Sequence, residues 1–575
     1  MLQVSLGQHT RAGRKEINQD FHGAAIPKEP LLSSKGIALA IADGIGSSPV
    51  SQLASAAAVR GFLDDYLCTA EAWSVQRSGQ RVLQATNSWL HAQNQRSDAR
   101  FDRDRGQVCT FSALILKGNA GHVLHVGDTR VCQLHAQALE PLTQDHRVQV
   151  SASETYLGRA LGVGPSVEVD HRTWTLNVGD VYLLSTDGVH EFIDAADVHQ
   201  ALAAHPADLD AAASALADMA FERGSPDNLT LQIVRVEQLG EAAVHTLHRQ
   251  RAELTLPPPL QARMSFEGYT IVRPLHASSR SHVHLAIDEL SGQHVALKTP
   301  SVDMREQPDY LDRFLLEEWV ARRLDSPHVL KPCGPSRPRQ HLFVAMEYIE
   351  GQTLAQWMND HRHPDLDSVR QVIDQVAKGL QAFHRREMLH QDLRPENIMI
   401  DRTGTVRIID FASVHVAGLA EGSEHARADA LLGSLQYTAP EYLLGHGGTA
   451  ASDLFSLAVL TYQMLTGQLP YGLQVARLRE PADVRKLRYV PLRDHRPDLP
   501  AWLDVVLRRA LHPDPHRRHE ALSEFVHELT ARGPGVHHHR GTPLIERNPV
   551  AFWRGLSLLL AVGCLVLLGL RLTGH

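Results

Sequence analysis

A polar segment that contains Pro257, Pro258 and Pro259 divides this chain near its middle. Regular apolar patterns stop before this segment and resume after it with a different character, as expected of a linker between independently folded units. A chain of 575 residues is also too long for a single hydrophobic core. We therefore predict a first domain over 1–237, a linker over 238–264 and a second domain over 265–530.

Composition narrows the class of protein. Apolar residues make up 43% of the chain and charged residues 21%, values that exclude a fully disordered chain. The formal net charge of −8 argues against nucleic acid as a partner. Five cysteines are scattered without a CxxC pair, which predicts a reducing compartment, and the first thirty residues lack the pattern of a secretory signal.

An uncharged run from Gly555 to Leu570 contains eight leucines. As a helix it is roughly 24 Å long, and the flanking residues bring it close to the ~30 Å hydrocarbon core of a bilayer. We predict a transmembrane anchor over 552–572, although a buried core helix is the alternative. Arginines before this run favour a tail anchor in the inner membrane, with the remainder of the chain in the cytoplasm.

The stretch over 531–551 is predicted to be a juxtamembrane spacer between the second domain and the anchor. Its three consecutive histidines, His537 to His539, offer imidazole groups to a metal ion. A solvated spacer is the favoured interpretation.

The first domain combines strand-like and helical patterns, which predicts an α+β fold of sheets covered by helices. Short links such as 117–120 favour antiparallel pairing. The expected strands are 36–42, 112–117, 122–126, 181–185 and 229–236, and the expected helices are 50–67, 77–94 and 206–221.

Aspartates stand directly beside four of these strands, and a fifth lies near the start of the chain: Asp43, Asp128, Asp187, Asp227 and Asp20. A single Asp-Gly pair is usually only a turn. Several carboxylates that converge from strand ends repel one another unless cations lie between them. Sites made only of oxygen ligands favour Mg²⁺ or Mn²⁺, and two such ions can activate water for attack on a phosphoryl group.

The order of these motifs resembles the metal-dependent Ser/Thr protein phosphatases of the type 2C family. The motifs are GRKEINQDF (13–21), ADGIGSS (42–48), HVGDTRV (125–131), LTQDH (142–146), LGRALG (157–162), LLSTDGV (183–189) and GSPDNLT (224–230). The resemblance implies a β-sandwich flanked by helices and a binuclear Mg²⁺ or Mn²⁺ centre. It also implies that Asp43 bridges the ions with the Gly44 carbonyl on one of them, while Asp187 and Asp227 complete the other. Asp20 then acts through water, and Asp128 serves a third, weaker ion.

Two positions depart from that family's pattern. Lys15, beside Arg14, occupies the position of the family's phosphate-binding arginine. A lysine provides a point charge in place of a bidentate fork, so we expect weaker phosphate binding unless Arg14 substitutes. Ile45 follows the Asp-Gly pair, where some members carry a histidine, and the general acid therefore stays undetermined.

The second domain resembles the eukaryotic-type Ser/Thr protein kinases, which have a bilobal fold. The resemblance is carried by HVALKTP (294–300), LHQDLRPENIMI (389–400), RIIDFAS (407–413) and YTAPEYLLG (437–445). It implies ATP with Mg²⁺ as cofactor. By position it implies that Lys298 anchors phosphates with Glu317 as its partner, with Glu318 left open as an alternative.

The remaining positions of the resemblance assign catalytic and scaffold roles. Asp392 takes the place of the catalytic base, Asn397 and Asp410 the Mg²⁺ positions, and Arg394 a cationic position near the transferred phosphate. Glu441, Arg518 and Asp453 match scaffold positions of the large lobe.

The departures from the kinase pattern affect nucleotide binding and activation. The loop over 276–281 contains no glycine, which predicts weak ATP binding. Gln391 replaces the arginine before the catalytic aspartate and so removes a partner for an activation-loop phosphate. Ala412 replaces the glycine that follows Asp410 and Phe411. A pseudokinase that senses ATP is therefore the alternative to an active kinase.

These inferences combine into one hypothesis. The chain is predicted to be a bacterial, membrane-tethered enzyme that removes phosphate from phosphoserine and phosphothreonine and also transfers it from ATP to Ser or Thr. Its expected partners are protein and phosphoprotein substrates, including its own activation segment, and the lipid bilayer. The candidate self-modification sites are Ser413, Ser423, Ser434 and Thr438.

Overall fold

The computed structural model describes residues 1–97, 102, 105–136, 138–149, 155–240, 254–278, 280–304, 307–334, 337–420, 435–478 and 480–530. The predicted spacer over 531–551 and the predicted anchor over 552–572 lie outside these residues, as do Ser423 and Ser434. Among the helices of the described part, none combines the length and the apolar character that a membrane crossing requires.

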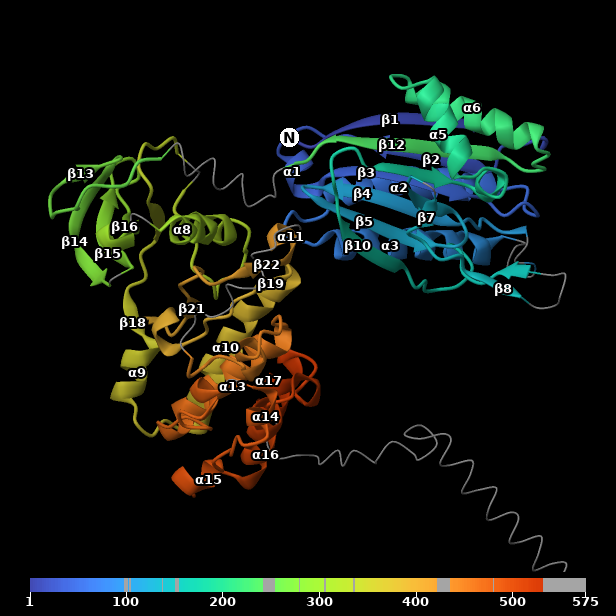
Figure 1. Cartoon of the computed structure of the whole chain (residues 1–575). Coiled ribbons are helices and arrows are strands. Elements are labelled where there is room, and N and C mark those ends of the chain that lie inside the picture. Colours follow the sequence, from blue (N-terminus) through green and yellow to red (C-terminus); the bar gives the residue numbers. More distant parts are fainter. Residues whose placement is uncertain are drawn as a thin grey trace, which may run out of the picture.

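Two five-stranded antiparallel sheets form the centre of the N-terminal domain (Figure 1). The first has the strand order β1 (Gln3–Arg11), β12 (Leu229–Gln238), β11 (Val181–Ser185), β6 (Arg130–Leu134) and β7 (Leu139–Pro141). The second has the order β10 (Asp170–Thr175), β5 (Ala120–Val126), β4 (Phe111–Lys117), β3 (Ile37–Asp43) and β2 (Asp20–Ala25). A short hairpin joins β8 (Arg147–Gln149) to β9 (Thr155–Leu157).

Helices cover the outer face of each sheet, so the domain is a sandwich with four layers (Figure 1). Helices α2 (Ser51–Cys68) and α3 (Val75–Arg96) pack on the second sheet, and α5 (Ala195–Ala204) and α6 (Leu209–Glu222) pack on the first. The short helices are α1 (Leu31–Lys35) and α4 (Asp187–His190). Strands β4 and β5 are buried at every position, because they have apolar layers on both faces.

The C-terminal domain begins with a five-stranded antiparallel sheet. Its order is β13 (Ser265–Phe266), β14 (Tyr269–Ala277), β15 (Ser281–Asp288), β16 (His294–Pro300) and β17 (Val344–Glu347). Helix α8 (Pro308–Ala321) packs beside β17 and follows the 3₁₀ turn η3 (Val302–Met304). These elements make the small lobe.

Helices make up most of the large lobe, and α13 lies at its centre with almost every residue buried. The helices are α9 (Leu354–Asp360), α10 (Leu366–Arg385), α11 (Ala417–Ala420), α12 (Pro440–Leu443), α13 (Ala450–Thr466), α14 (Pro481–Val484), α15 (Leu492–His495), α16 (Ala501–Ala510) and α17 (Leu522–Thr530), with 3₁₀ turns η4 (Pro395–Asn397), η6 (Val475–Arg477) and η7 (Pro515–Arg517). Small sheets pair β18 (Gly351–Thr353), β20 (Ile398–Asp401) and β21 (Val406–Ile408), and β19 (Met388–Leu389) with β22 (His415–Val416).

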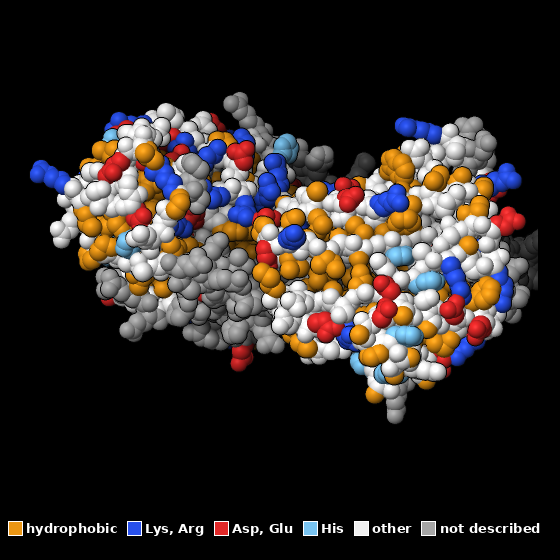
Figure 2. All heavy atoms as spheres, turned by 90° about the horizontal axis from the view of Figure 1, so that it is seen from above, with side chains coloured by type: hydrophobic (Ala, Val, Ile, Leu, Met, Phe, Trp, Pro, Cys, Tyr) orange, Lys and Arg blue, Asp and Glu red, His pale blue; other side chains and the backbone are white. Residues whose placement is uncertain are grey.

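The surface carries no large area of a single charge on the face that Figure 2 shows. Basic and acidic side chains are interspersed there with apolar and neutral ones. Long-range electrostatic attraction of a highly charged partner to this face is therefore weak.

Candidate active sites

Five predicted aspartates of the N-terminal domain lie at or next to strand ends. Asp20 begins β2 and Asp43 ends β3, and the two residues lie directly opposite one another in the antiparallel register. Asp128 follows β5, Asp187 begins α4 just after β11, and Asp227 precedes β12. The two sheets thus bring carboxylates that are far apart in sequence to one end of the sandwich.

The electrostatics of these aspartates show that their charges interact. Burial raises the pKa of Asp43 well above its usual value, and the charges of the other four carboxylates raise it further. Burial also raises the pKa of Asp20 to about 7, although Thr186 donates a hydrogen bond of 2.9 Å to its carboxylate. Burial and the neighbouring carboxylates raise the pKa of Asp187 to about 6. A bound cation would relieve this repulsion.

Arg147 is a member of this cluster that the sequence motifs missed. Its guanidinium donates to Asp128 (2.8 Å), Asp187 (3.1 Å) and Glu191 (2.9 Å). It stands immediately after the LTQDH motif, so extending that motif by one residue would have drawn attention to it. Arg147 partly neutralises the acidic cluster and competes for two of the proposed metal ligands.

The two candidate phosphate-binding cations point in different directions. Lys15 Nζ lies 3.1 Å from Asp227 Oδ1, and it is close enough to Gly46 that a Cβ added there would be 3.1 Å from it. Arg14 instead donates to the backbone carbonyls of Ser225 (2.7 Å) and Phe221 (3.0 Å). Lys15 is therefore the cation that faces the carboxylates.

Gly44 is packed too closely to carry a side chain. A Cβ at this position would lie 2.8 Å from the side chain of Ser51 and 2.9 Å from the carbonyl oxygen of Gln19.

Within the described residues, no three His, Cys, Asp or Glu side chains are arranged around a single metal position. The donors at this end of the sandwich are carboxylates and backbone carbonyls, and this oxygen-only chemistry fits Mg²⁺ or Mn²⁺.

In the C-terminal domain, Lys298 on β16 reaches Glu317 on α8. The Lys298 ammonium lies 2.7 and 2.8 Å from the two Glu317 oxygens and 3.4 Å from Asp410 Oδ1. Burial alone would lower the pKa of Lys298, but the carboxylates of Asp410 and Glu317 outweigh it and raise the pKa above its usual value. Lys298 is thus held as a cation that links the small lobe to Asp410.

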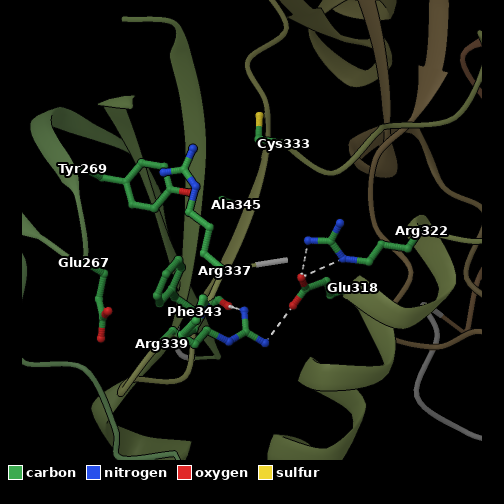
Figure 3. Close-up of a pocket in the computed structure, with 10 residues that line it drawn as sticks. Glu267, Tyr269, Glu318, Arg322, Cys333, Arg337, Arg339, Phe343 and Ala345 are labelled. Carbon is green, nitrogen blue, oxygen red and sulfur yellow. Dashed lines mark hydrogen bonds and ion pairs between the residues drawn. The ribbon is translucent and has the colours of Figure 1, made fainter. Parts of the chain in front are cut away.

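Glu318 pairs with two arginines on another side of α8, so Glu317 is the glutamate that pairs with Lys298. Its carboxylate accepts from Arg322 (2.7 Å) and Arg339 (2.8 Å) at a pocket beside the small-lobe sheet (Figure 3). Lys298, Glu317 and Asp410 are not among the residues that line this pocket. The two neighbouring glutamates therefore serve different sides of α8.

The remaining proposed kinase residues cluster around the segment after β19. Asn397 donates to the backbone oxygen of Asp392 (2.9 Å) and to its carboxylate (3.0 Å), which fixes the aspartate's orientation. Arg394 is close enough to Asp392 for their charges to interact, and its Nε donates to Glu396 (2.7 Å). Asp410 accepts from the Ala412 N–H (3.1 Å).

A buried carboxylate braces this catalytic segment. Asp453 accepts hydrogen bonds from the backbone N–H groups of His390 and Gln391 (both 3.0 Å) and from the His384 ring (2.8 Å). Gln391 has a φ of 64°, a left-handed conformation that costs energy in a residue with a side chain. Asp453 offsets that cost and holds Asp392 in place.

The loop without glycines closes through serine hydroxyls. Ser278 Oγ donates to the Ser281 carbonyl (3.1 Å) and accepts from the Ser281 N–H (3.1 Å). The Arg280 carbonyl accepts from the Tyr310 hydroxyl (2.7 Å) and the Ser301 N–H (2.8 Å). These bonds tie the loop to α8 and to the segment after β16, and they limit how closely its backbone can follow a phosphate.

Comparison with known families agrees with both resemblances. The family model described as protein phosphatase 2C matches residues 8–229, and the protein kinase domain model matches residues 269–529. The chain carries a protein phosphatase 2C domain followed by a protein kinase domain. The prediction of two enzyme domains, drawn from the motifs, is therefore confirmed.

The kinase domain is similar to bacterial Ser/Thr protein kinases. Serine/threonine-protein kinase PrkC of Bacillus subtilis is 25% identical over 267 residues, a match that covers 45% of this chain and 40% of PrkC. The PknI kinase domain of Mycobacterium tuberculosis is 28% identical with a TM-score of 0.37, covering 47% of this chain and 98% of that one.

A solved phosphatase structure is also similar to part of this chain. The serine/threonine phosphatase of S. agalactiae is 24% identical with a TM-score of 0.36, and the match covers 41% of this chain and 100% of that one.

Proposed function

We propose that the phosphatase domain hydrolyses phosphoserine and phosphothreonine in proteins, with two divalent cations held by its aspartates. The convergence of Asp43 with Asp20, Asp128, Asp187 and Asp227 at one end of the sandwich supports this proposal, and their charges raise the pKa of the buried Asp43. Bound Mg²⁺ or Mn²⁺ supplies positive charge to the phosphoryl group and makes water more acidic. The Gly44 carbonyl adds a further oxygen ligand to the same set.

Phosphate recognition falls to Lys15 in this proposal. Its ammonium already lies beside Asp227 and can turn toward a phosphoryl oxygen as a point charge. Arg14 is held by two backbone carbonyls and contributes only to the shape of this region. Arg147 neutralises part of the cluster when cations are absent.

We propose that the kinase domain is catalytically active. The contacts that join Lys298, Glu317 and Asp410 support this proposal, because phosphoryl transfer requires charged groups that are already positioned. Lys298 would hold the ATP phosphates, and Asn397 and Asp410 would hold Mg²⁺. Asp392 would accept the proton of the attacking Ser or Thr hydroxyl while the γ-phosphoryl group moves to that oxygen.

The two activities oppose one another on shared substrates in this proposal. The activation segment lies between Asp410 and Glu441 and contains the four candidate sites Ser413, Ser423, Ser434 and Thr438. The kinase can modify this segment, and the phosphatase can reverse the modification. Covalent linkage gives each domain an effective concentration near the other of about the millimolar scale. The predicted anchor over 552–572 would hold both domains at the cytoplasmic face of the inner membrane.

Radiolabelled ATP separates the possibilities in the full-length chain. We expect the Asp43→Asn protein to accumulate more label than the wild type, because the phosphatase no longer removes it. Adding Asp392→Asn should abolish incorporation. If the double variant and the Asp43→Asn variant incorporate equally little label, while ATP still changes the phosphatase activity of the wild-type chain, the kinase domain is an ATP sensor.

A further inference from the structure

A loop of the phosphatase domain packs against the kinase domain. This docking loop, Thr69–Ser74, joins α2 to α3, and its Ala72 is fully buried within the hydrophobic core of the kinase domain. The Ala72 carbonyl accepts from the N–H of Gly418 (3.0 Å) in α11. Figure 1 shows α11 at the boundary between the two domains.

Three further contacts of the docking loop reach other parts of the kinase domain. Glu71 pairs with Arg323 (2.6 Å), two residues beyond the C-terminal end of α8. The Trp73 indole N–H donates to the Arg385 carbonyl at the end of α10 (3.0 Å). The Ser74 N–H and hydroxyl donate to the Glu387 carboxylate (2.7 and 2.9 Å).

Hydrogen bonds within the phosphatase domain fix the conformation of the docking loop. Lys35 is almost completely buried, and its ammonium donates to Thr69 Oγ1 (2.7 Å), the Ala70 carbonyl (2.8 Å) and Ser78 Oγ (3.2 Å). A buried lysine is costly unless its donors are satisfied, so these bonds fix the loop firmly. The loop therefore meets the kinase domain already ordered and loses little entropy on docking.

Gly418 leaves no room for a side chain once the loop is docked. A Cβ at this position would lie 2.8 Å from the carbonyl oxygens of Glu71, Ala72 and Trp73. The backbone of Gly418 is helical, and the three atoms nearest to this Cβ all belong to the phosphatase domain. The need for glycine arises from the phosphatase domain. Lys117 of that domain also donates to the Gly418 carbonyl (2.6 Å).

The docked elements are continuous with the proposed kinase site. Strands β19 and β22 form a two-stranded ribbon that begins just after Glu387 and ends just before α11. Asp392 follows β19 in the chain, and Asp410 precedes β22. Glu317 lies on α8, and Arg323 follows two residues after the end of this helix. The docking loop thus contacts residues that adjoin the elements carrying or preceding Asp392 and Glu317.

We propose that the phosphatase domain acts as a built-in activating subunit of the kinase domain. The docked loop holds the β19–β22 ribbon and the end of α8 in the arrangement in which Lys298 pairs with Glu317. Gln391 is uncharged and gives an activation-segment phosphate no cation at its position, so docking provides order that phosphorylation does not. This inference rests on the proposed kinase activity.

The test compares two Gly→Ala variants in the full-length Asp43→Asn chain. Gly418→Ala introduces the clash with the docking loop. Gly447→Ala is the matched control, because a Cβ at the exposed Gly447 meets no atom within 4 Å. Hydrogen exchange of segments 69–74 and 413–420 measures docking, and the initial rate of label incorporation from ATP measures kinase activity.

We expect Gly418→Ala to speed hydrogen exchange in both segments and to slow labelling at least about fivefold, the lower range of coupling between sites. Gly447→Ala should match its parent. With Asp43 restored, Gly418→Ala should cleave a phosphopeptide at the wild-type rate. Faster exchange with labelling unchanged or increased would overturn the inference, as would unchanged exchange. If the Asp43→Asn parent and its Gly447→Ala variant both fail to label, the proposed kinase activity itself is wrong.

Charge exchange offers a second route that creates no steric clash. Glu71→Arg and Arg323→Glu each place like charges together and should slow labelling, whereas the double variant restores an opposite pair and should recover much of the rate. Additive losses in the double variant would exclude Glu71 from activation.

Discussion

The buried pair of Arg518 and Glu441 permits a quantitative prediction about the kinase fold. The Arg518 side chain has no exposed surface, and Glu441 is 7% exposed. Arg518 donates to both Glu441 oxygens (2.8 and 2.7 Å) and to the carbonyls of His512 (2.7 Å), Ala451 (2.8 Å) and Pro513 (3.1 Å). A single guanidinium thus joins α12, α13 and the segment before η7.

Arg518→Met removes the cation but leaves the Glu441 carboxylate buried, where it still accepts a hydrogen bond from the Ser452 hydroxyl (2.7 Å). Removing one partner of a buried ion pair costs about 3–5 kcal/mol of folding free energy. Glu441→Met leaves the arginine buried without its anion and should cost a similar amount. The double variant leaves no unpaired charge, so its loss should be smaller than the sum of the single losses by at least about 2 kcal/mol.

Hydrogen exchange of the full-length chain measures these losses domain by domain. Segments of α13 and α16 report on the kinase domain, and segments of β4 and β5 in the phosphatase domain serve as the internal control. We expect faster exchange in the kinase segments alone. A single-variant loss below about 1 kcal/mol, or strictly additive losses, would refute the argument that the pair is coupled and structurally essential.

Three further predictions concern pH and the two active sites. Burial lowers the pKa of His122 to about 3, so protonation of the unfolded chain below pH ~6.5 should destabilise the phosphatase domain, by about 2–3 kcal/mol at pH 4.5. The folding free energy of the His122→Gln variant should therefore fall less between pH ~6.5 and pH 4.5 than that of the wild type. An equal fall in both proteins would contradict this reasoning. Lys15→Met should lower kcat/KM for a phosphopeptide about tenfold while Arg14→Met changes it less than about twofold, and the reverse order would assign phosphate binding to Arg14. The KM for ATP should lie near or above about 1 mM because the loop over 276–281 lacks glycine, and a micromolar value in initial-rate measurements would refute this.

Regular elements were well predicted where the apolar pattern is strong. The expected strand over 181–185 matches β11, and the expected helix over 50–67 differs from α2 by one residue at each end. The patterns are clear because these elements bury one or both faces in a continuous core. Strands β1 and β10 were missed, since their burial alternates irregularly and many of their side chains are polar and partly exposed.

The sites were predictable to the extent that each residue stands in a motif. Asp43 and Lys298 are recognisable because their neighbours in sequence form a buried strand. The docking loop was not recognisable, and Arg147 could be noticed only as the residue that follows a motif, because their partners lie elsewhere in the chain and share no local pattern with them. Contacts of this kind depend on how the two sheets and the two domains are placed, which periodicity does not encode.

Linking the two activities in one chain has a consequence for how phosphorylation of the activation segment depends on protein concentration. If both domains act on their own chain, the steady-state phosphorylated fraction depends only on the ratio of two first-order rates, and dilution leaves it unchanged. If the kinase acts on a second chain while the phosphatase acts on its own, that fraction falls on dilution. Docking favours the second case, because the docking loop restrains the activation segment at Gly418, within α11. Confinement of chains to a bilayer by the predicted anchor would then raise phosphorylation by raising their local concentration.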